Sequence, residues 1–586
     1  MTDAPEKAIL DRLDNAEIVE ADFNDDPVPD YAPQPPEVQP GEGAAPSRFS
    51  PIEPVIVKDC AALDQNDTDN GRRLINHFGR DILFVREVGP HVWNGSHWNA
   101  EGGQEGVERF AQEVARRIKL ESADILPSKR EAEILSVGEG LAERAAETLS
   151  EAEKVALRAA NEVAARLAKR KSDRYKFAVS CGNRARTVAM IAQAVPHCSI
   201  APAALDADPM KFNVQNGTLV FRKHVEDVDD PECPDPDIRR TVRRVRVGMV
   251  LAPHDRAALI AKIAPINHDP HARCRVFLRF LRRMQPDRSL RKYLQTAIGR
   301  ALLGGAATQV LIFLYGDGAN GKSVFMEVFS RLLGNYSGRL KPETISGTTE
   351  GRGDQATPDL ARLAGKRFVA IAELPRGMPL REGLVKTVTG GEEIPVRHLN
   401  KGFFDMLPEF IPFMSGNEMP DIGGLDEGIW RRLKFVHWPV KVPEAERRPF
   451  REMVEELLTE SPGILNWAIE GALRFLRDGL QEPPSVTVLT QEHRGDLDPV
   501  GAFLRACVRT RTGGEVQARL MYLAFVSFCE ANAIRPWKEK SFSMALKKKG
   551  LVRDDKRIRT WLDVELHDVP ARMETRGLQA PGGDGA

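Results

Sequence analysis

The residues with the clearest chemical signature form a glycine-rich loop, Gly316-Asp317-Gly318-Ala319-Asn320-Gly321-Lys322-Ser323. The loop follows the apolar run 310–314, typical of a strand buried on both faces, and precedes residues 324–333, which have a helical pattern. A strand, a glycine loop and a helix in this order are the context that a phosphate-binding P-loop requires. Its backbone N–H groups can point at phosphate oxygens beside a helix N-terminus. We therefore predict that Lys322 contacts the β- and γ-phosphates of a nucleoside triphosphate and that Ser323 binds Mg²⁺.

Two later apolar segments end in polar residues suited to ATP hydrolysis. Residues 367–372 lead to Glu373, and an acid at this place in P-loop ATPases holds the water shell of the metal or polarises the attacking water. Residues 410–416 lead to Asn417, whose amide could sense the γ-phosphate or orient the lytic water.

A pair of arginines, Arg431 and Arg432, follows these segments. Guanidinium groups can spread over the phosphate charge of a transition state, often from a neighbouring subunit. Either arginine could instead pair with Asp426 or Glu427, so the sequence leaves open which of the two reaches a phosphate.

The composition of the whole chain limits the classes of protein to consider. At 586 residues it is too long for one core, and two to four domains are expected. The seven cysteines are scattered without a C-x-x-C pair, which argues against a zinc ribbon and is typical of a reducing compartment. Neither a run of about 18 apolar residues nor a basic-then-apolar leader is present. We expect a cytoplasmic protein that has no membrane partner.

The net charge of −1 conceals segments of very different charge, which help to divide the chain. Residues 1–50 hold twelve acidic residues against three basic ones, together with many prolines, and such a segment cannot offset its ordering entropy by burial. The predicted division is a disordered acidic tail (1–54), a mixed α+β and mainly helical domain (55–275), an ATPase domain (276–482), a basic winged-helix-like domain (490–568) and a disordered tail (569–586).

The mainly helical domain begins with a capped helix start at residues 66–78 and continues into strands with a hairpin turn at Asn94-Gly95. The tryptophans of that hairpin, Trp93 and Trp98, would either stack on bases or pack in the core. Residues 105–172 predict a charged helical hairpin or arm.

Two further segments precede the glycine-rich loop. The basic strand 239–246 is either a phosphate contact or a solvated edge strand. Residues 272–304 have the pattern of two amphipathic helices that lead into the strand before the loop.

The C-terminal part predicts three helices (500–509, 517–532 and 540–549) followed by a short hairpin (strands 551–553 and 558–562), the order of a winged helix. Residues 531–560 hold ten Lys or Arg against three acids, which would complement a DNA backbone, although a solvated basic face is the alternative. The candidate DNA contacts lie at the end of the predicted recognition helix and in the wing: Lys547, Lys548, Lys549, Lys556, Arg557 and Arg559.

Five motifs follow one another along the chain: Gly-Ala-Asn-Gly-Lys-Ser (318–323), Pro-Asp-Leu-Ala-Arg-Leu-Ala-Gly-Lys-Arg-Phe (358–368), Thr-Gly-Gly-Glu-Glu (389–393), Ser-Gly-Asn-Glu-Met-Pro (415–420) and Asp-Glu-Gly-Ile-Trp-Arg-Arg (426–432). In this order they resemble the motifs of superfamily 3 helicases of the phage/plasmid primase–helicase family, which are related to the poxvirus primase–helicases. Residues 66–302, which include Asn-Gly-Thr-Leu at 216–219, are similar to the helical domain that precedes the ATPase in that family. The resemblance covers about 55–440.

The resemblance implies an α/β fold with an AAA+-like ATPase core, which uses ATP and Mg²⁺ and moves 3′→5′ on single-stranded DNA as a hexameric ring. In these terms Lys322 and Ser323 are the Walker A pair and Glu373 is the Walker B acid. Asn417 becomes the sensor, and Arg431 or Arg432 the arginine finger. The segment 392–404 falls where the family has a DNA-gripping loop, with Arg397, His398 and Lys401 as candidate contacts.

Two departures from the family pattern matter. Ala372 stands where many members have a second acid, so Glu373 acts without a partner acid. Only about 60 residues precede the helical domain and no zinc-binding cysteines are present, so primase activity is not expected.

The sequence thus predicts an ATP-dependent helicase for phage, prophage or plasmid DNA replication in a bacterial cell. Its partners would be single-stranded and forked DNA and further copies of itself, with a separate primase or initiator as further candidates. The alternative is an origin-binding or replication-initiation protein in which the nucleotide only switches assembly.

Overall fold

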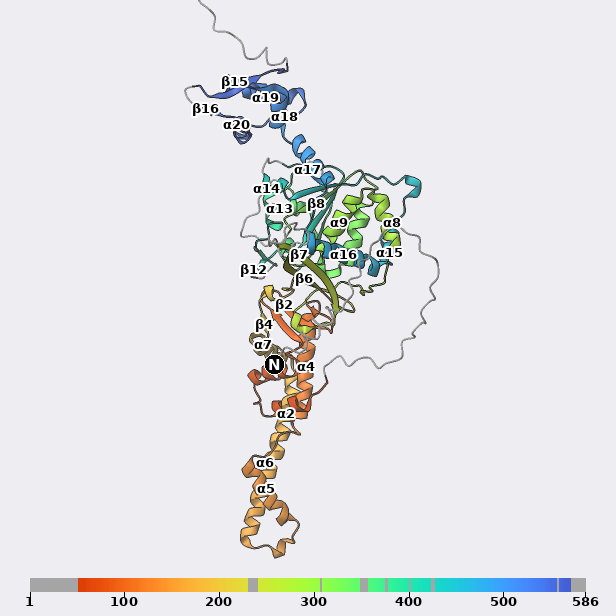
Figure 1. The fold of residues 1–586 in the computed structure, drawn as a ribbon. Coiled ribbons are helices and arrows are strands. Elements are labelled where there is room, and N and C mark those ends of the chain that lie inside the picture. Colours follow the sequence, from red (N-terminus) through yellow and green to blue (C-terminus); the bar gives the residue numbers. More distant parts are fainter. Residues whose placement is uncertain are drawn as a thin grey trace, which may run out of the picture. The chain divides into compact units, whose positions relative to one another are not determined.

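The computed structural model describes residues 51–229, 241–305, 308–347, 357–374, 378–399, 402–422, 427–555 and 558–570 (Figure 1). The tails predicted at 1–54 and 569–586 lie almost entirely outside these ranges. None of the helices in the described part of the chain has both the length and the apolarity that a membrane span requires.

The first region is mainly helical and carries a small sheet in the order β3-β2-β1-β4. Its predicted helix start is confirmed, because the Asn66 side chain caps α3 by accepting a bond from Asp69 N at 2.7 Å. The fully buried Glu121 pairs with Arg73 at 2.9 Å and with Arg174, which ties α3, α4 and α6 together. The elements are α2 Pro54–Ala61, α3 Asp67–Phe78, β1 Ile82–Val85, β2 Gly89–Trp93, β3 Trp98–Asn99, α4 Gly103–Glu121, α5 Lys129–Ala142, α6 Glu151–Cys181, α7 Arg184–Ala194 and β4 Ser199–Ile200.

The predicted helical hairpin is the pair α5 and α6, which lie side by side in Figure 1. Each helix begins with a capping box, Ser128 with Glu131 and Ser150 with Glu153, which satisfies backbone donors at the helix start. The predicted turn at Asn94-Gly95 is also present, since Trp93 pairs with Trp98 across β2 and β3.

Trp98 packs in the core, and this decides between the two alternatives for that side chain. It is 3% exposed and its Nε1 donates to the carbonyl of Arg256 at 3.0 Å. The Trp93 ring lies 5.7 Å from the Trp98 ring and is half-buried. Neither observation assigns a base contact to this hairpin.

A three-stranded meander follows, with β5 Lys211–Val214, β6 Gly217–Asp229 and β7 Thr241–Ala252 in the order β5-β6-β7. The predicted basic strand is the edge strand β7, and its first predicted residues, 239 and 240, lie outside the described residues. The buried Asn213 of β5 joins three parts of the chain. Its Nδ2 donates to Ser96 O at 2.8 Å, its Oδ1 accepts from Thr218 Oγ1 at 2.7 Å, and its backbone N–H donates to Tyr336 Oη at 3.0 Å.

The central sheet has five parallel strands in the order β14-β8-β13-β10-β9. Strand β8 is buried on both faces, as predicted, because Ile312 and Leu314 belong to one hydrophobic cluster while Leu311 and Phe313 belong to another. The helices α8, α9, α10, α15 and α16 contribute to the first cluster. The strands are β8 Leu311–Tyr315, β9 Ser337–Leu340, β10 Phe368–Ile371, β13 Ile411–Gly416 and β14 Leu433–His437, and the helices are α8 Arg275–Met284, α9 Arg288–Arg300, α10 Lys322–Leu332, α15 Phe450–Leu458 and α16 Ser461–Asp478.

The opposite face of the sheet is covered by shorter elements that include an antiparallel hairpin of β11 and β12. Helix α17 packs on β14, since the ring of His493 on α17 lies 5.0 Å from the ring of Phe435 on β14. The Nε2 atom of His493 is also 3.2 Å from the carbonyl of Pro420. These elements are α11 Pro342–Ile345, α12 Pro358–Ala361, α13 Glu382–Val388, β11 Ile394–Arg397, β12 Phe403–Met406, α14 Glu427–Trp430 and α17 Pro484–Asp496.

The last region has its own hydrophobic cluster and a sheet in the order β15-β17-β16. Its three predicted helices are confirmed within two residues, but the sequence missed β15. That strand is polar and largely exposed, with a register shift between Thr510 and Glu515, so it lacks the apolar alternation that marks a strand. The elements are α18 Pro499–Cys507, β15 Val508–Gln517, α19 Ala518–Ala531, α20 Glu539–Lys548, β16 Arg553–Asp554 and β17 Thr560–Leu566.

Tyr336→Phe tests the bond that links the meander to the central sheet. The Tyr336 side chain is fully buried and stacks on Phe212 at 4.4 Å, so Phe preserves the packing but leaves the Asn213 N–H without its acceptor. We expect a loss of ~1–3 kcal/mol in the free energy of unfolding, measured by urea denaturation. The exposed Tyr175→Phe is the control and should change it by less than about 0.5 kcal/mol. Equal values for the two variants would contradict the role of this bond.

Candidate functional site

The glycine-rich loop lies where β8 ends and α10 begins, as predicted. Gly321 has a φ of +81° and forms the N-cap of α10. A Cβ at Gly321 would lie 3.0 Å from the Phe280 ring and 3.1 Å from Met284 Cγ. A Cβ at Gly316 would lie 2.3 Å from Trp438 O. Both glycines therefore allow close approaches that other residues would obstruct.

The loop is held in shape by the segment that follows β14. Trp438 Nε1 donates to Asn320 O at 2.6 Å, and Asn320 Nδ2 donates back to Trp438 O at 3.2 Å. Val442 N donates to Ala319 O at 2.9 Å. These bonds hold the loop backbone in one conformation, so its N–H donors are preorganised.

The structure brings Lys322, Asn417 and Glu373 together at the carboxyl edge of the sheet. Lys322 Nζ donates to Asn417 Oδ1 at 3.1 Å and to Gly316 O. Asn417 in turn donates to Glu373, from its backbone N to Oε1 at 3.0 Å and from Nδ2 to Oε2 at 3.2 Å. Residues predicted from three separate segments thus form one hydrogen-bonded chain.

The Lys322 ammonium is a buried charge. Burial lowers the pKa of Lys322 below its ordinary value, and the carboxylates of Glu373 and Asp317 only partly oppose this shift. Such a group gains from an anionic ligand, because the ligand would restore a favourable environment for the charged form.

A cavity of about 610 Å³ opens in front of this network. Its polar end contains the loop with Ser323, Glu373 and Asn417. Apolar side chains also line the cavity, with Phe280 and Met284 from α8 and with Phe450 and Met453 from α15. A cavity of this size with polar groups converging at one end is typical of a site for a small organic ligand.

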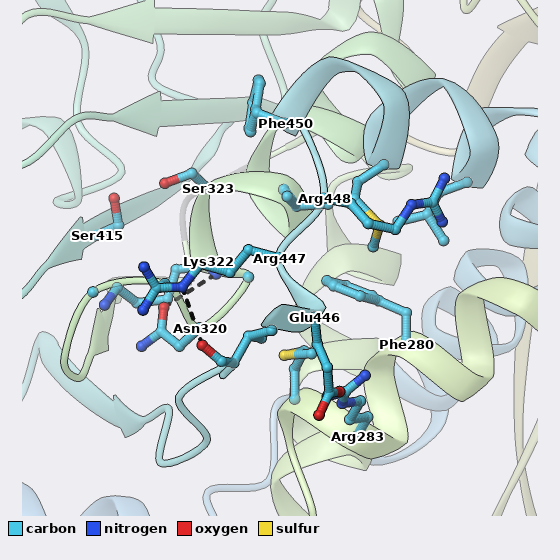
Figure 2. Close-up of a pocket in the computed structure, with 18 of the residues that line it drawn as sticks. Phe280, Arg283, Asn320, Lys322, Ser323, Ser415, Glu446, Arg447, Arg448 and Phe450 are labelled. Atoms are coloured by element: carbon cyan, nitrogen blue, oxygen red, sulfur yellow. Dashed lines mark hydrogen bonds and ion pairs between the residues drawn. The ribbon is translucent and has the colours of Figure 1, made fainter. Parts of the chain in front are cut away.

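Several cavity residues were missed by the sequence analysis, among them Arg447 and Arg448 (Figure 2). Arg447 Nε donates to Val442 O at 3.2 Å, and Arg448 pairs with Glu456. The composition of residues 444–480 predicts helix, but α15 begins only at Phe450, so both arginines lie in the segment before it. No motif spacing in the sequence connects Arg447 and Arg448 with the glycine-rich loop, because only the tertiary fold brings the two segments to the same cavity.

The two candidate arginines occupy different environments. Arg432 is 9% exposed, its Nη1 donates to Gly428 O at 2.6 Å, and its carbonyl accepts a bond from Leu311 N at 2.7 Å. Arg431 is exposed, with Nη2 3.4 Å from Gln309 Oε1. Both lie at the start of β8 and β14, whereas the glycine-rich loop leaves the opposite end of β8. Neither arginine lines the cavity of its own chain.

The predicted DNA-gripping segment is the hairpin of β11 and β12. The Arg397 guanidinium lies 4.7 Å from the centre of the Phe403 ring, and the His398 ring stacks on Phe404 at 5.8 Å. Phe403 is 49% exposed, which leaves an aromatic face available beside the cation. Lys401 lies outside the described residues.

The C-terminal lysines also differ from one another. Lys549 Nζ contacts Asp498 at 2.5 Å and Lys547 Nζ lies 3.5 Å from Asp555, whereas Lys548 is exposed. Lys556 and Arg557 lie outside the described residues. Arg559 lines a second cavity, of about 370 Å³, together with Lys540, Lys547 and Arg553.

Comparisons with known proteins find similar sequences among viral proteins. Residues 71–286 match the family described as "D5 N terminal like". The chain is 32% identical over 242 residues to a "Putative helicase" of Acanthamoeba polyphaga mimivirus, which covers 38% of this chain and 25% of that protein. It is 24% identical over 272 residues to a "Putative helicase" of Frog virus 3, which covers 44% and 28%. It is 25% identical over 250 residues to a "Putative primase" of African swine fever virus, which covers 39% and 26%.

The D5-like match over residues 71–286 and the similarity to viral putative helicases and a putative primase support a place for the chain in the phage and viral primase–helicase family. The chain spans about a quarter of the length of the curated relatives given above.

The lowered pKa of Lys322 predicts how phosphate binding depends on pH. Only the protonated amine attracts phosphate, so affinity for inorganic tripolyphosphate should be full well below the lowered pKa and should decline as the pH rises toward 10.5, the ordinary lysine value. Calorimetric titration between about pH 7 and 10 measures this, with circular dichroism as the check on folding. Lys322→Arg keeps its charge throughout and should flatten the profile. A wild-type affinity that stays constant to pH 10 would contradict the prediction.

Proposed function

We propose that the chain is an ATP-dependent DNA helicase with an AAA+-like core of the superfamily 3 type. The observation that carries this proposal is the Lys322–Asn417–Glu373 chain of hydrogen bonds at the carboxyl edge of a parallel sheet. Ligands of open α/β folds bind at that edge. The relatives named as helicases support the same reading.

The residues of the cavity fit a magnesium nucleotide. The desolvated Lys322 suits an anion, and the loop donates backbone N–H groups at the start of α10. Ser323 is exposed at the cavity and would hold the metal directly, while Glu373 would hold it through water. Bound Mg²⁺ would supply charge neutralisation at the phosphates. Lys322 would exchange its two protein acceptors, Gly316 O and Asn417 Oδ1, for phosphate oxygens.

Glu373 and Asn417 are suited to act on the attacking water. The carboxylate accepts two bonds from Asn417, which fix its orientation toward the cavity. A carboxylate held in this way can polarise a water. The Asn417 amide would lose its bond from Lys322 Nζ when Lys322 binds a phosphate. The network therefore links phosphate binding to the position of the catalytic acid.

The arginine finger would be Arg431, supplied by a neighbouring subunit. Arg431 is exposed at the edge of the sheet opposite the glycine-rich loop of the same chain. The guanidinium of Arg432 instead donates to the carbonyl of Gly428. A cation so placed can complete only the site of another copy, which requires a head-to-tail ring. The hexameric stoichiometry and the 3′→5′ direction rest on the family resemblance.

Two surfaces are proposed to contact DNA. The β11–β12 hairpin offers Arg397, His398 and the exposed Phe403 to a single strand, with backbone attraction and base stacking combined. In the last region α19 and α20 are followed by the β16–β17 hairpin, an order that fits a winged helix, and α20 carries Lys547 and Lys548. Lys549 is given a structural role, because its ammonium pairs with Asp498.

Glu373→Gln separates a motor from a nucleotide-switched initiation protein. The amide keeps the shape but not the charge, so nucleotide binding should persist while hydrolysis falls ~100-fold or more and unwinding is lost. Hydrolysis and unwinding of a tailed duplex are measured beside Lys322→Ala, which should lose nucleotide binding as well. Wild-type DNA function in Glu373→Gln, despite lost hydrolysis, would favour the initiation protein.

Mixing two inactive variants tests the role of Arg431 in a neighbouring subunit. Arg431→Ala and Lys322→Ala should each abolish hydrolysis, yet an equal mixture should recover about a quarter of it, because one interface in four joins an intact Lys322 to an intact Arg431. The measurement is steady-state ATPase activity after co-refolding or subunit exchange. Arg432→Ala is the control and should lower stability instead. No recovery in rings of verified mixed composition would refute action between subunits.

A further inference from the structure

Helix α8 presents a row of arginines to solvent. Arg275, Arg279 and Arg282 are exposed and recur at spacings of four and three residues, which places them within about 60° of one helix face. Arg283 lies next to this row. The opposite face is apolar and buried, with Phe277, Phe280, Leu281 and Met284.

The positive charge continues into α9, where Arg288 and Lys292 are exposed. Between residues 271 and 292 the only acid is Asp287, and its carboxylate caps α9 by accepting bonds from Ser289 N at 2.7 Å and Leu290 N at 3.4 Å. Arg291 donates to Gln285 O at 2.8 Å and to Pro286 O at 2.6 Å, which fixes the turn between the helices. We call Arg275, Arg279, Arg282, Arg283, Arg288 and Lys292 the arginine stripe.

Two acids near the stripe have assigned partners. Glu460 caps α8 by accepting bonds from Val276 N at 3.1 Å and Phe277 N at 2.9 Å. Glu446 pairs with Arg283 at one end of the stripe. Within the described residues Arg275, Arg279 and Arg282 form no side-chain hydrogen bond or ion pair. These three arginines therefore carry positive charge that no ion pair in the described part of the chain neutralises.

The make-up of the stripe distinguishes between a protein partner and a nucleic acid. Protein interfaces depend on exposed aromatic or aliphatic anchors, and among the described residues of α8 and α9 no large hydrophobic side chain is exposed. Contacts to a phosphate backbone need only cations, and the planar guanidinium binds phosphate through paired hydrogen bonds. Five of the six stripe residues are arginines.

We propose that the arginine stripe binds the phosphate backbone of DNA and transmits this contact to the nucleotide cavity. The proposal rests on the proposed function, because the stripe gains its role from a DNA-dependent ATPase. It adds a DNA contact outside the β11–β12 hairpin and the C-terminal region.

Helix α8 is suited to couple the two ligands because it faces both. Phe280 and Met284 pack directly on Gly321 of the phosphate-binding loop, and Arg279 and Arg283 line the same cavity (Figure 2). The pairing of Arg283 with Glu446 joins the stripe to the segment that carries Arg447. A DNA contact on the outer face of α8 would therefore reach the loop through Phe280 and Met284, which already contact Gly321.

The test removes three stripe charges that do not line the cavity, in Arg275→Gln/Arg282→Gln/Arg288→Gln. Binding of a fluorescein-labelled single-stranded oligonucleotide is followed by anisotropy across salt concentrations. Each lost phosphate contact lowers the slope of log K against log salt by about 0.7, so the slope should fall by about 2 and affinity by ~10-fold or more. DNA-stimulated ATPase activity should fall in parallel, while activity without DNA stays unchanged.

A matched control removes the same number of charges from the exposed side of α6, in Arg158→Gln/Arg166→Gln/Lys169→Gln. This variant should bind DNA as the wild type does. Unchanged affinity in the stripe variant, or equal losses in both variants, would overturn the proposal. Failure of the proposed function would differ, because the wild type would then show no DNA-stimulated ATPase activity at all.

Discussion

The site depends on one buried ammonium group, that of Lys322, which has lost most of its water and is stabilised by oxygens from two different loops. Those oxygens can meet only if β8, β10 and β13 hold their register. Gly416 pairs with Tyr315 across β8 and β13, and Ile371 pairs with Met414 across β10 and β13. The hydrophobic clusters on both faces of the sheet hold the strands in this register. A slip of one residue would leave the buried Lys322 ammonium without its acceptors.

Around this charge the chain arranges elements from distant parts of the sequence. Helix α8 lines the cavity, and the segment after β14 lines it through Val442 and bonds the glycine-rich loop through Trp438. Because each of these elements contacts the loop backbone directly, a movement of either changes the geometry of the phosphate site. In the proposed function, close packing rather than any single long-range interaction couples the outer face of α8 to the cavity.

The sequence predicts well those features that local patterns encode. The P-loop context, the two acid- and amide-terminated strands and the helices of the last region all follow from apolar runs and glycine spacing. The cavity wall does not, because Phe280, Phe450 and Met453 have the ordinary pattern of core helices and only the tertiary fold shows that they face a cavity. The proposed choice of Arg431 over Arg432 likewise depends on how far the fold buries each side chain, since adjacent identical residues carry no distinguishing sequence pattern.

The contact between α8 and Gly321 crosses the end of the D5-like region, which closes at residue 286. One wall of the cavity is therefore encoded in that region and the glycine-rich loop in the next. A recombination event that joined the D5-like region of one relative to the following region of another would bring a foreign Phe280 and Met284 against the loop. Junctions placed before Arg275 keep this contact within one inherited segment. Module exchange in this family should accordingly respect the start of α8 rather than the recognised domain border.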